Sequence, residues 1–81
     1  KLWQIYPNPV SASTTLRIAA ELSNLQVMLT DLSGRVLYRN TYSNATTGLQ
    51  IVLPLQRLSK GTYLIKLTSD KGSSTEKLLV Q

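Results

Sequence analysis

The chain has 81 residues, 42% of them hydrophobic, and its nine Lys and Arg residues outweigh four Asp and Glu residues, giving a formal net charge of +5. A chain of this length forms one domain, which buries only roughly 60–65% of the surface that its unfolded form exposes. It has no cysteine and no histidine, which excludes disulfides and any Cys- or His-based metal site, and no apolar run approaches the roughly 20 residues of a membrane helix.

The first predicted elements are two short strands joined by a proline-rich corner. Residues 2–6 form an apolar strand that Pro7-Asn8-Pro9 stops, because proline donates no backbone hydrogen bond and forces the residue before it into extended geometry. We expect a stiff, extended corner at a sheet edge, followed by a small polar loop over residues 11–13. Residues 15–19 then alternate apolar and polar side chains, which predicts a half-buried strand.

A hairpin is predicted in the middle of the chain. Residues 21–24 turn the chain, and residues 25–30 alternate as a strand. Asp31-Leu-Ser-Gly34 is a hairpin signal, because Asp31 caps a type I turn whose fourth residue is Gly34. Residues 36–42 are expected to return antiparallel.

On this returning strand, we expect the side chains of Val36 and Tyr38 to lie on one face. A polar loop over residues 44–48 follows, and residues 49–53 alternate again as a strand that Pro54 ends.

Residues 58–67 join a turn to the most strongly patterned strand of the chain. Gly61 can adopt positive φ, so we expect residues 58–61 to form a turn whose fourth residue is this glycine. Tyr63, Ile65 and Leu67 fall on one side of the strand. We expect this strand to be central in its sheet.

The final elements are a turn and a strand. Ser69-Asp-Lys-Gly72 repeats the turn chemistry of residues 31–34, with Gly72 in place of Gly34, and residues 75–80 form the last strand. Seven short strands with turn signals between them and no helical window predict an all-β fold, an antiparallel seven-stranded immunoglobulin-like β-sandwich. An open barrel is the alternative.

The ends of the sequence also carry an expectation. The chain begins directly in strand-like sequence, without an initiator Met or a secretory signal, and it finishes in the strand-like Lys77-Leu-Leu-Val-Gln81. We therefore expect a single domain over residues 1–81, excised as a module from the C-terminus of a longer protein.

Enzymatic function is not expected. The chain has no histidine for general base catalysis and no cysteine nucleophile. Asp31 and Asp70 already serve as turn residues, and no Gly-rich phosphate loop or acidic metal-binding run is present. The sequence predicts no catalytic residue, no metal ion and no cofactor.

The positive charge is spread along the chain without a basic run. Such a surface either serves solubility or attracts an anionic partner, such as an acidic polysaccharide or a membrane surface. Nucleic acid is not expected as a partner, because Trp3 and the tyrosines do not interleave with clustered Lys and Arg.

Four motifs follow one another along the chain. They are Tyr6-Pro-Asn-Pro9, Asp31-Leu-Ser-Gly-Arg35, Leu58-Ser-Lys-Gly-Thr-Tyr63 and Lys77-Leu-Leu-Val80. In this order and spacing they resemble the type A C-terminal sorting domain of the type IX secretion system of Bacteroidetes. The resemblance covers nearly the whole chain. By position, its early motif matches Pro7, Asn8 and Pro9, its late glycine–aromatic motif Gly61 and Tyr63, and its terminal strand motif Lys77, Leu78, Leu79 and Val80.

The resemblance implies a route and partners. Such domains direct a cargo protein from the periplasm through the type IX translocon of the outer membrane, with an outer-membrane shuttle protein as a further partner. A sortase-like peptidase then typically removes the domain, here at or before Lys1, and joins the cargo to an anionic lipopolysaccharide. The implied destination is the outer membrane, the cell surface or the medium.

The residues suggest how such a signal is read. Pro7 and Pro9 donate no ladder hydrogen bond, so we expect the first strand to be loosely held and accessible to a processing enzyme. Residues 75–80 offer an edge that a transport partner can read by strand addition, and they also allow a strand-swapped homodimer. Gly61 and Tyr63 either contribute to recognition or only keep the sandwich folded.

Two other functions remain open at the level of sequence. The five aromatic residues either pack in the core or form a sugar-stacking platform, which would make the chain a carbohydrate-binding surface module. A purely structural β-sandwich spacer is the other alternative. The aromatic residues are Trp3, Tyr6, Tyr38, Tyr42 and Tyr63.

Overall fold

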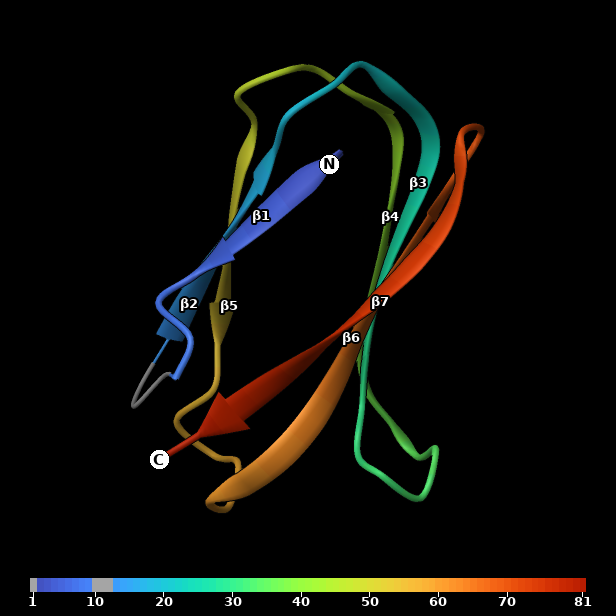
Figure 1. Ribbon diagram of the computed structural model, residues 1–81. Coiled ribbons are helices and arrows are strands. Elements are labelled where there is room, and N and C mark those ends of the chain that lie inside the picture. Colours follow the sequence, from blue (N-terminus) through green and yellow to red (C-terminus); the bar gives the residue numbers. More distant parts are fainter. Residues whose placement is uncertain (1, 10–12) are drawn as a thin grey trace.

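A computed structural model describes residues 2–9 and 13–81. The described chain forms seven antiparallel strands in two sheets that face each other (Figure 1). The strands are β1 Trp3–Tyr6, β2 Ser13–Ile18, β3 Leu22–Thr30, β4 Val36–Ala45, β5 Gln50–Pro54, β6 Gly61–Ser69 and β7 Gly72–Val80.

The order of the strands explains the architecture. One sheet has the order β1-β2-β5 and the other β4-β3-β6-β7. The predicted all-β, seven-stranded antiparallel sandwich is confirmed, while its immunoglobulin-like character stays a prediction. β6 pairs with β3 on one side and β7 on the other, so the central place predicted for it is also confirmed. Among the described residues, no helix has the length and hydrophobicity needed to span a bilayer.

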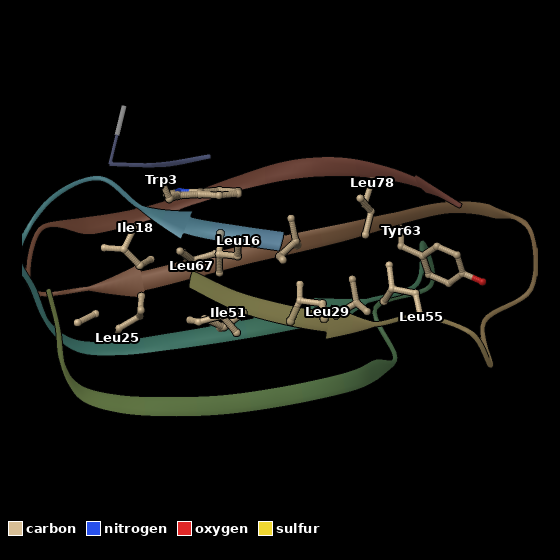
Figure 2. Close-up of a cluster of buried hydrophobic side chains, with 14 of the residues drawn as sticks. Trp3, Leu16, Ile18, Leu25, Leu29, Ile51, Leu55, Tyr63, Leu67 and Leu78 are labelled. Atoms are coloured by element: carbon tan, nitrogen blue, oxygen red, sulfur yellow. The ribbon is translucent and has the colours of Figure 1, made fainter. Parts of the chain in front are cut away.

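The core lies between the two sheets and consists of one face of each. On β6, Tyr63, Ile65 and Leu67 are 8%, 0% and 3% exposed, as the alternation predicted. Figure 2 shows side chains of both sheets meeting in one layer, with Trp3 and Tyr63 far apart within it. Because side chains alternate across a strand, burying one set leaves the other set on the outer face of each sheet.

The turn between β3 and β4 forms as its sequence predicted. The N–H of Gly34 donates to the Asp31 carbonyl oxygen at 3.1 Å, and Gly34 has a φ of +93°. Asp31 Oδ1 accepts the N–H of Ser33 at 2.9 Å and that of Arg35 at 3.0 Å. The carboxylate therefore holds both arms of the turn.

Two predicted boundaries are wrong. Residues 21–24 do not form the turn, because β3 begins at Leu22, and the loop predicted at 44–48 begins later, because β4 runs through Ala45. Leu22 pairs with Ala45, and both are buried. The strands therefore extend to bury these two side chains, and the polar residues around them do not end the sheet.

The prediction that Val36 and Tyr38 share a face is also wrong. The register between β3 and β4 shifts, so that Leu29 pairs with Tyr38 and Thr30 with Val36, leaving Leu37 as an extra residue. A β-bulge of this kind reverses the alternation beyond it. Tyr38 consequently packs against the core, while Val36 is 41% exposed.

Two predicted turns differ from the structure in their details. The turn placed at residues 58–61 lies three residues earlier, with the N–H of Leu58 donating to the Leu55 carbonyl oxygen at 3.1 Å. Asp70 does not repeat the role of Asp31, because its carboxylate accepts the N–H of Ser23 at 2.8 Å. This aspartate ties the β6–β7 hairpin to β3, a contact that local sequence cannot indicate. Positions 11 and 12 of the predicted polar loop lie outside the described residues.

The core assignment predicts a large cost for truncating Ile65. We expect Ile65→Ala to lower the free energy of unfolding by about 2–5 kcal/mol and Ile65→Val by about 0.5–1.5 kcal/mol. Thr68→Ala, on the exposed face of the same strand, should change it by less than about 0.5 kcal/mol. Urea denaturation measures all three. A cost for Thr68→Ala equal to that for Ile65→Ala would contradict the register of β6.

The β3–β4 turn predicts an acid-sensitive contribution to stability. Hydrogen bonds from Ser33 and Arg35 lower the pKa of Asp31 below its ordinary value of 3.8. A lowered folded-state pKa gives stability that is present above the unfolded-state pKa and is lost as pH falls through the folded-state pKa. The free energy of unfolding should therefore fall less between neutral and acid pH in Asp31→Asn than in the wild type. Urea titrations of both proteins at each pH measure this difference. Identical profiles would show that the turn carboxylate contributes nothing.

Candidate functional site

Three of the four motifs singled out in the sequence meet at one place, the last four residues of β7. Residues 77–80 lie at the edge of the four-stranded sheet, and the side chains of Leu78 and Val80 are buried while those of Lys77 and Leu79 are exposed. The glycine–aromatic motif lies on β6, the neighbouring strand of the sheet, and the proline-rich corner lies at the free edge of β7. The segment around which the other two gather is thus the terminal strand.

On the inner side, β6 pairs with the segment. Gly61 is the partner of Val80, and Tyr63 is the partner of Leu78. Gly61 has a φ of +152°, a conformation that residues with a Cβ rarely adopt. The hydroxyl of Tyr63 donates to the Ser59 carbonyl oxygen at 2.6 Å and so holds the loop that precedes β6.

On the outer side, Asn8 binds the backbone of the terminal strand. Its Nδ2 donates to the Lys77 carbonyl oxygen at 2.9 Å, and its Oδ1 accepts the N–H of Leu79 at 3.1 Å. In a parallel sheet, one residue bonds in the same way to residues i and i+2 of its neighbour. The side-chain amide of Asn8 therefore takes the place of one peptide group of an adjacent strand, and we call this contact the Asn8 clasp.

Two further contacts hold the clasp in position. The carbonyl oxygen of Pro7 accepts a hydrogen bond of 2.8 Å from the hydroxyl of Thr14, which is 1% exposed. The indole Nε1 of Trp3 donates to Ser74 Oγ at 2.6 Å, which joins β1 to β7 across the gap between the sheets. Pro7, Asn8 and Pro9 are exposed, and the first strand pairs with β2 over its whole length. That this strand is loosely held stays a prediction.

The remainder of the β7 edge is open. Lys77 and Leu79 direct backbone groups away from β6 towards Asn8, so by alternation the N–H and C=O groups of Ser73 and Thr75 also point outward. Within residues 2–9 and 13–81, these outward groups have no hydrogen-bond partner. An edge of this kind is a template for pairing with another strand.

The other predicted site residues lie apart from the clasp. Asp31 and Gly34 lie at the same end of the sheet but beyond β3, since Thr30 pairs with Leu64 of β6. Gly72 lies at the opposite end, in the β6–β7 hairpin, with a φ of +110°. These three residues shape turns and do not contribute to the clasp.

The aromatic residues do not form a common exposed platform. Trp3 and Tyr63 are buried, and Tyr38 and Tyr42 pack against the core. Burial raises the pKa of Tyr42 above its ordinary value. Tyr6 is 44% exposed. The carbohydrate-stacking alternative is not favoured, because the face of the Trp3 ring is not available to a sugar.

The carboxylates hold the backbone in place. Glu21 Oε2 accepts the N–H of Thr47 at 2.7 Å, which lowers the pKa of Glu21 below its ordinary value, and Asp31 and Asp70 bind backbone N–H groups as described above. In the described part of the chain, no three Asp, Glu, His or Cys residues lie close enough to hold a metal ion. A cavity of about 230 Å³ beside Trp3 has a largely apolar lining that includes Leu22, Leu25 and Leu67.

Sequence reasoning identified the residues of the clasp but missed how they are connected. Asn8 was assigned to a corner, and nothing around it indicates a partner 69 residues further along. The available signal was chemical. The side-chain amide of Asn8 has both a donor and an acceptor, and the two prolines beside it have no N–H that the acceptor could bind.

The clasp predicts a local effect of changing Asn8. Asn8→Ala removes both hydrogen bonds and should lower the free energy of unfolding by about 1 kcal/mol, since both are exposed. The Leu79 amide should exchange with solvent faster, whereas the Leu78 amide, which faces β6, should not. Asn8→Asp keeps an acceptor for Leu79 and should protect its amide more than Asn8→Ala does.

Asn44→Ala, at the exposed opposite edge of the same sheet, is the matched control and should leave Leu79 unchanged. Amide hydrogen exchange measured by NMR reports each position separately. Unaltered Leu79 exchange in Asn8→Ala would contradict the clasp.

Comparison with known proteins agrees with the place of these motifs. The family model described as the secretion system C-terminal sorting domain matches residues 4–81, and so includes all three segments that meet at the clasp. No curated protein matches the chain. The chain belongs to the family of secretion system C-terminal sorting domains, and it is a C-terminal sorting signal for type IX secretion.

Proposed function

We propose that this chain is a type A sorting domain of a Bacteroidetes protein, that it performs no reaction itself, and that the secretion machinery recognises it at the Asn8 clasp. One observation carries this proposal. The amide of Asn8 bonds to Lys77 and Leu79, which makes a single surface from the two ends of the domain. A passive role is supported by the absence of histidine and cysteine from the sequence and by carboxylates that bind backbone groups.

Recognition at the clasp makes sorting depend on folding. Asn8 and Leu79 are 71 residues apart in sequence, so the surface that they share exists only when both sheets have formed. A translocon or shuttle protein that binds this surface therefore selects folded domains in the periplasm. A linear C-terminal peptide would carry no such information.

Strand addition is the mode of binding that the open edge supports. The outward backbone groups of Ser73 and Thr75 can pair with an extended segment of a partner, and the Asn8 clasp limits that pairing at Lys77. The same edge position allows β7 to be exchanged between two copies in a strand-swapped homodimer.

Processing follows export in this proposal. A sortase-like peptidase cuts at or before Lys1 and joins the cargo to an anionic lipopolysaccharide on the cell surface. The position of the cut is supported by the hydrogen bond from the Ala19 N–H to the Leu2 carbonyl oxygen at 2.8 Å. This bond brings residue 2 into the sheet, so an accessible scissile bond has to lie before it.

A reporter fusion in a type IX-competent bacterium tests the proposal. We expect residues 1–81 to export the reporter, and we expect deletion of residues 77–81 to leave it in the periplasm. Because the deletion also removes buried Leu78 and Val80, Asn8→Ala is the sharper variant. It keeps the core, and it should lower the exported fraction by several-fold.

Asn44→Ala should export normally, and protease resistance of the periplasmic fusion should confirm that Asn8→Ala still folds. Normal export of a folded Asn8→Ala fusion would show that the machinery does not read the clasp. Normal export after deletion of residues 77–81 would refute the role of the terminal strand as well.

A further inference from the structure

The outer face of the four-stranded sheet has an arrangement of charge that its sorting role does not explain. The inward side chains of this sheet, including Val27, Leu29, Ile65 and Leu78, are 0–2% exposed. Their neighbours along each strand therefore point to the opposite, outer face. The registers of β3, β4, β6 and β7 then show which outward residues lie beside one another.

Three cations meet on this face. Arg39 and Lys66 both pair with Met28, on either side of it, and Lys77 pairs with Leu64, the outward residue that precedes Lys66 by two. All three cations are exposed. We call this set the basic face.

The spacing of the basic face follows from sheet geometry. Strands in a sheet lie about 4.8 Å apart and alternate residues about 6.8 Å apart, so the Cα atoms of Arg39 and Lys66 are separated by roughly 10 Å and those of Lys66 and Lys77 by roughly 8 Å. Arg39 Nη2 lies 3.9 Å from Met28 Sδ, so its side chain extends over the sheet towards Lys66. The three charges thus form one cluster.

Within residues 2–9 and 13–81, the Asp and Glu side chains lie away from these cations. Glu21 and Asp70 lie at the end of the sheet that holds the β6–β7 hairpin, and Asp31 lies in the β3–β4 turn, where it pairs with Arg35 at 3.4 Å. Glu76 alternates with the outward Lys77 and so occupies an inward position on β7. The four Asp and Glu side chains are therefore all directed away from the basic face.

Polar side chains that bind sugar hydroxyls surround the cations. They have hydroxyl or amide groups, each of which can donate and accept a hydrogen bond. Six of them occupy outward positions of the same strands: Gln26, Thr30, Thr41, Thr68, Ser73 and Thr75.

We propose that the basic face binds an anionic polysaccharide, with Arg39, Lys66 and Lys77 contacting successive charged groups of the chain and the hydroxyl and amide side chains contacting its sugars. This binding goes beyond the sorting function and does not use the aromatic residues. Charge complementarity and the hydroxyl-rich face favour an extended polar polymer. A lipid surface fits less well, because interfacial binding uses clustered Trp, Phe and Leu side chains. On the strands of this sheet, the two large apolar side chains that are exposed, Val36 and Leu79, lie on opposite edge strands.

Binding of dextran sulfate to the 81-residue chain, measured by calorimetry at low salt, tests the proposal. Neutral dextran is the uncharged control polymer and should not bind. We expect the triple variant Arg39→Gln/Lys66→Gln/Lys77→Gln to bind dextran sulfate roughly a hundredfold more weakly, since each surface cation contributes about fivefold in affinity. Added salt should weaken binding of the wild type.

A second triple variant, Arg17→Gln/Arg57→Gln/Lys60→Gln, removes the same three charges from elsewhere on the chain and should bind within about fivefold of the wild type. Thermal unfolding of both variants should match the wild type, because all six side chains are at least partly exposed. Equal loss in the two variants would overturn the proposal in favour of diffuse charge, and no binding by the wild type would overturn it outright. Tighter binding to phosphatidylglycerol vesicles than to dextran sulfate would overturn it in favour of a lipid surface.

Discussion

The pairing of β7 with the edge of β6 is the interaction on which the rest of this structure depends. It places Leu78 and Val80 in the core and fixes which backbone groups of the last strand face outward. A cysteine-free domain of 81 residues has no covalent cross-link to compensate for a strand that detaches. The edge of β7 therefore has to be held by non-covalent contacts from another part of the chain, and Asn8 and Trp3 make them.

The clasp connects the stability of the domain with its use as a signal. An unprotected edge strand invites pairing with other chains, and proteins usually block such edges with charge, proline or a covering segment. Here two exposed prolines flank an amide that occupies one position of the edge, while Ser73 and Thr75 remain open. One part of this edge is thus blocked against pairing with other chains, while the rest remains available to a specific partner.

Periodicity predicted the fold because most strands bury a single face. Leu16 and Ile18, or Tyr63, Ile65 and Leu67, identify their strands by alternation alone, and Asp31 and Gly34 identify their turn by local chemistry. The predictions were wrong where distant contacts override local preference. Burial of Leu22 against Ala45 extends two strands, a bulge moves Val36 to the outer face, and Asp70 binds Ser23 of another strand. Ala45 and Asp70 are far in sequence from their partners, and the bulge, although it lies within one hairpin, is a change of register that alternation alone does not indicate.

The sequence alone determined that this is a small all-β domain, and its four motifs in order identified the family. Both follow from information that is local: alternation within a strand, turn residues within a turn, and short motifs at fixed intervals. Only the tertiary structure decided that three of the four motifs meet at the end of β7, because Asn8 meets Lys77 and Leu79 through the closure of two sheets upon each other. The charge of the outer face was decided in the same way, since strand register and not sequence order brings Arg39, Lys66 and Lys77 together.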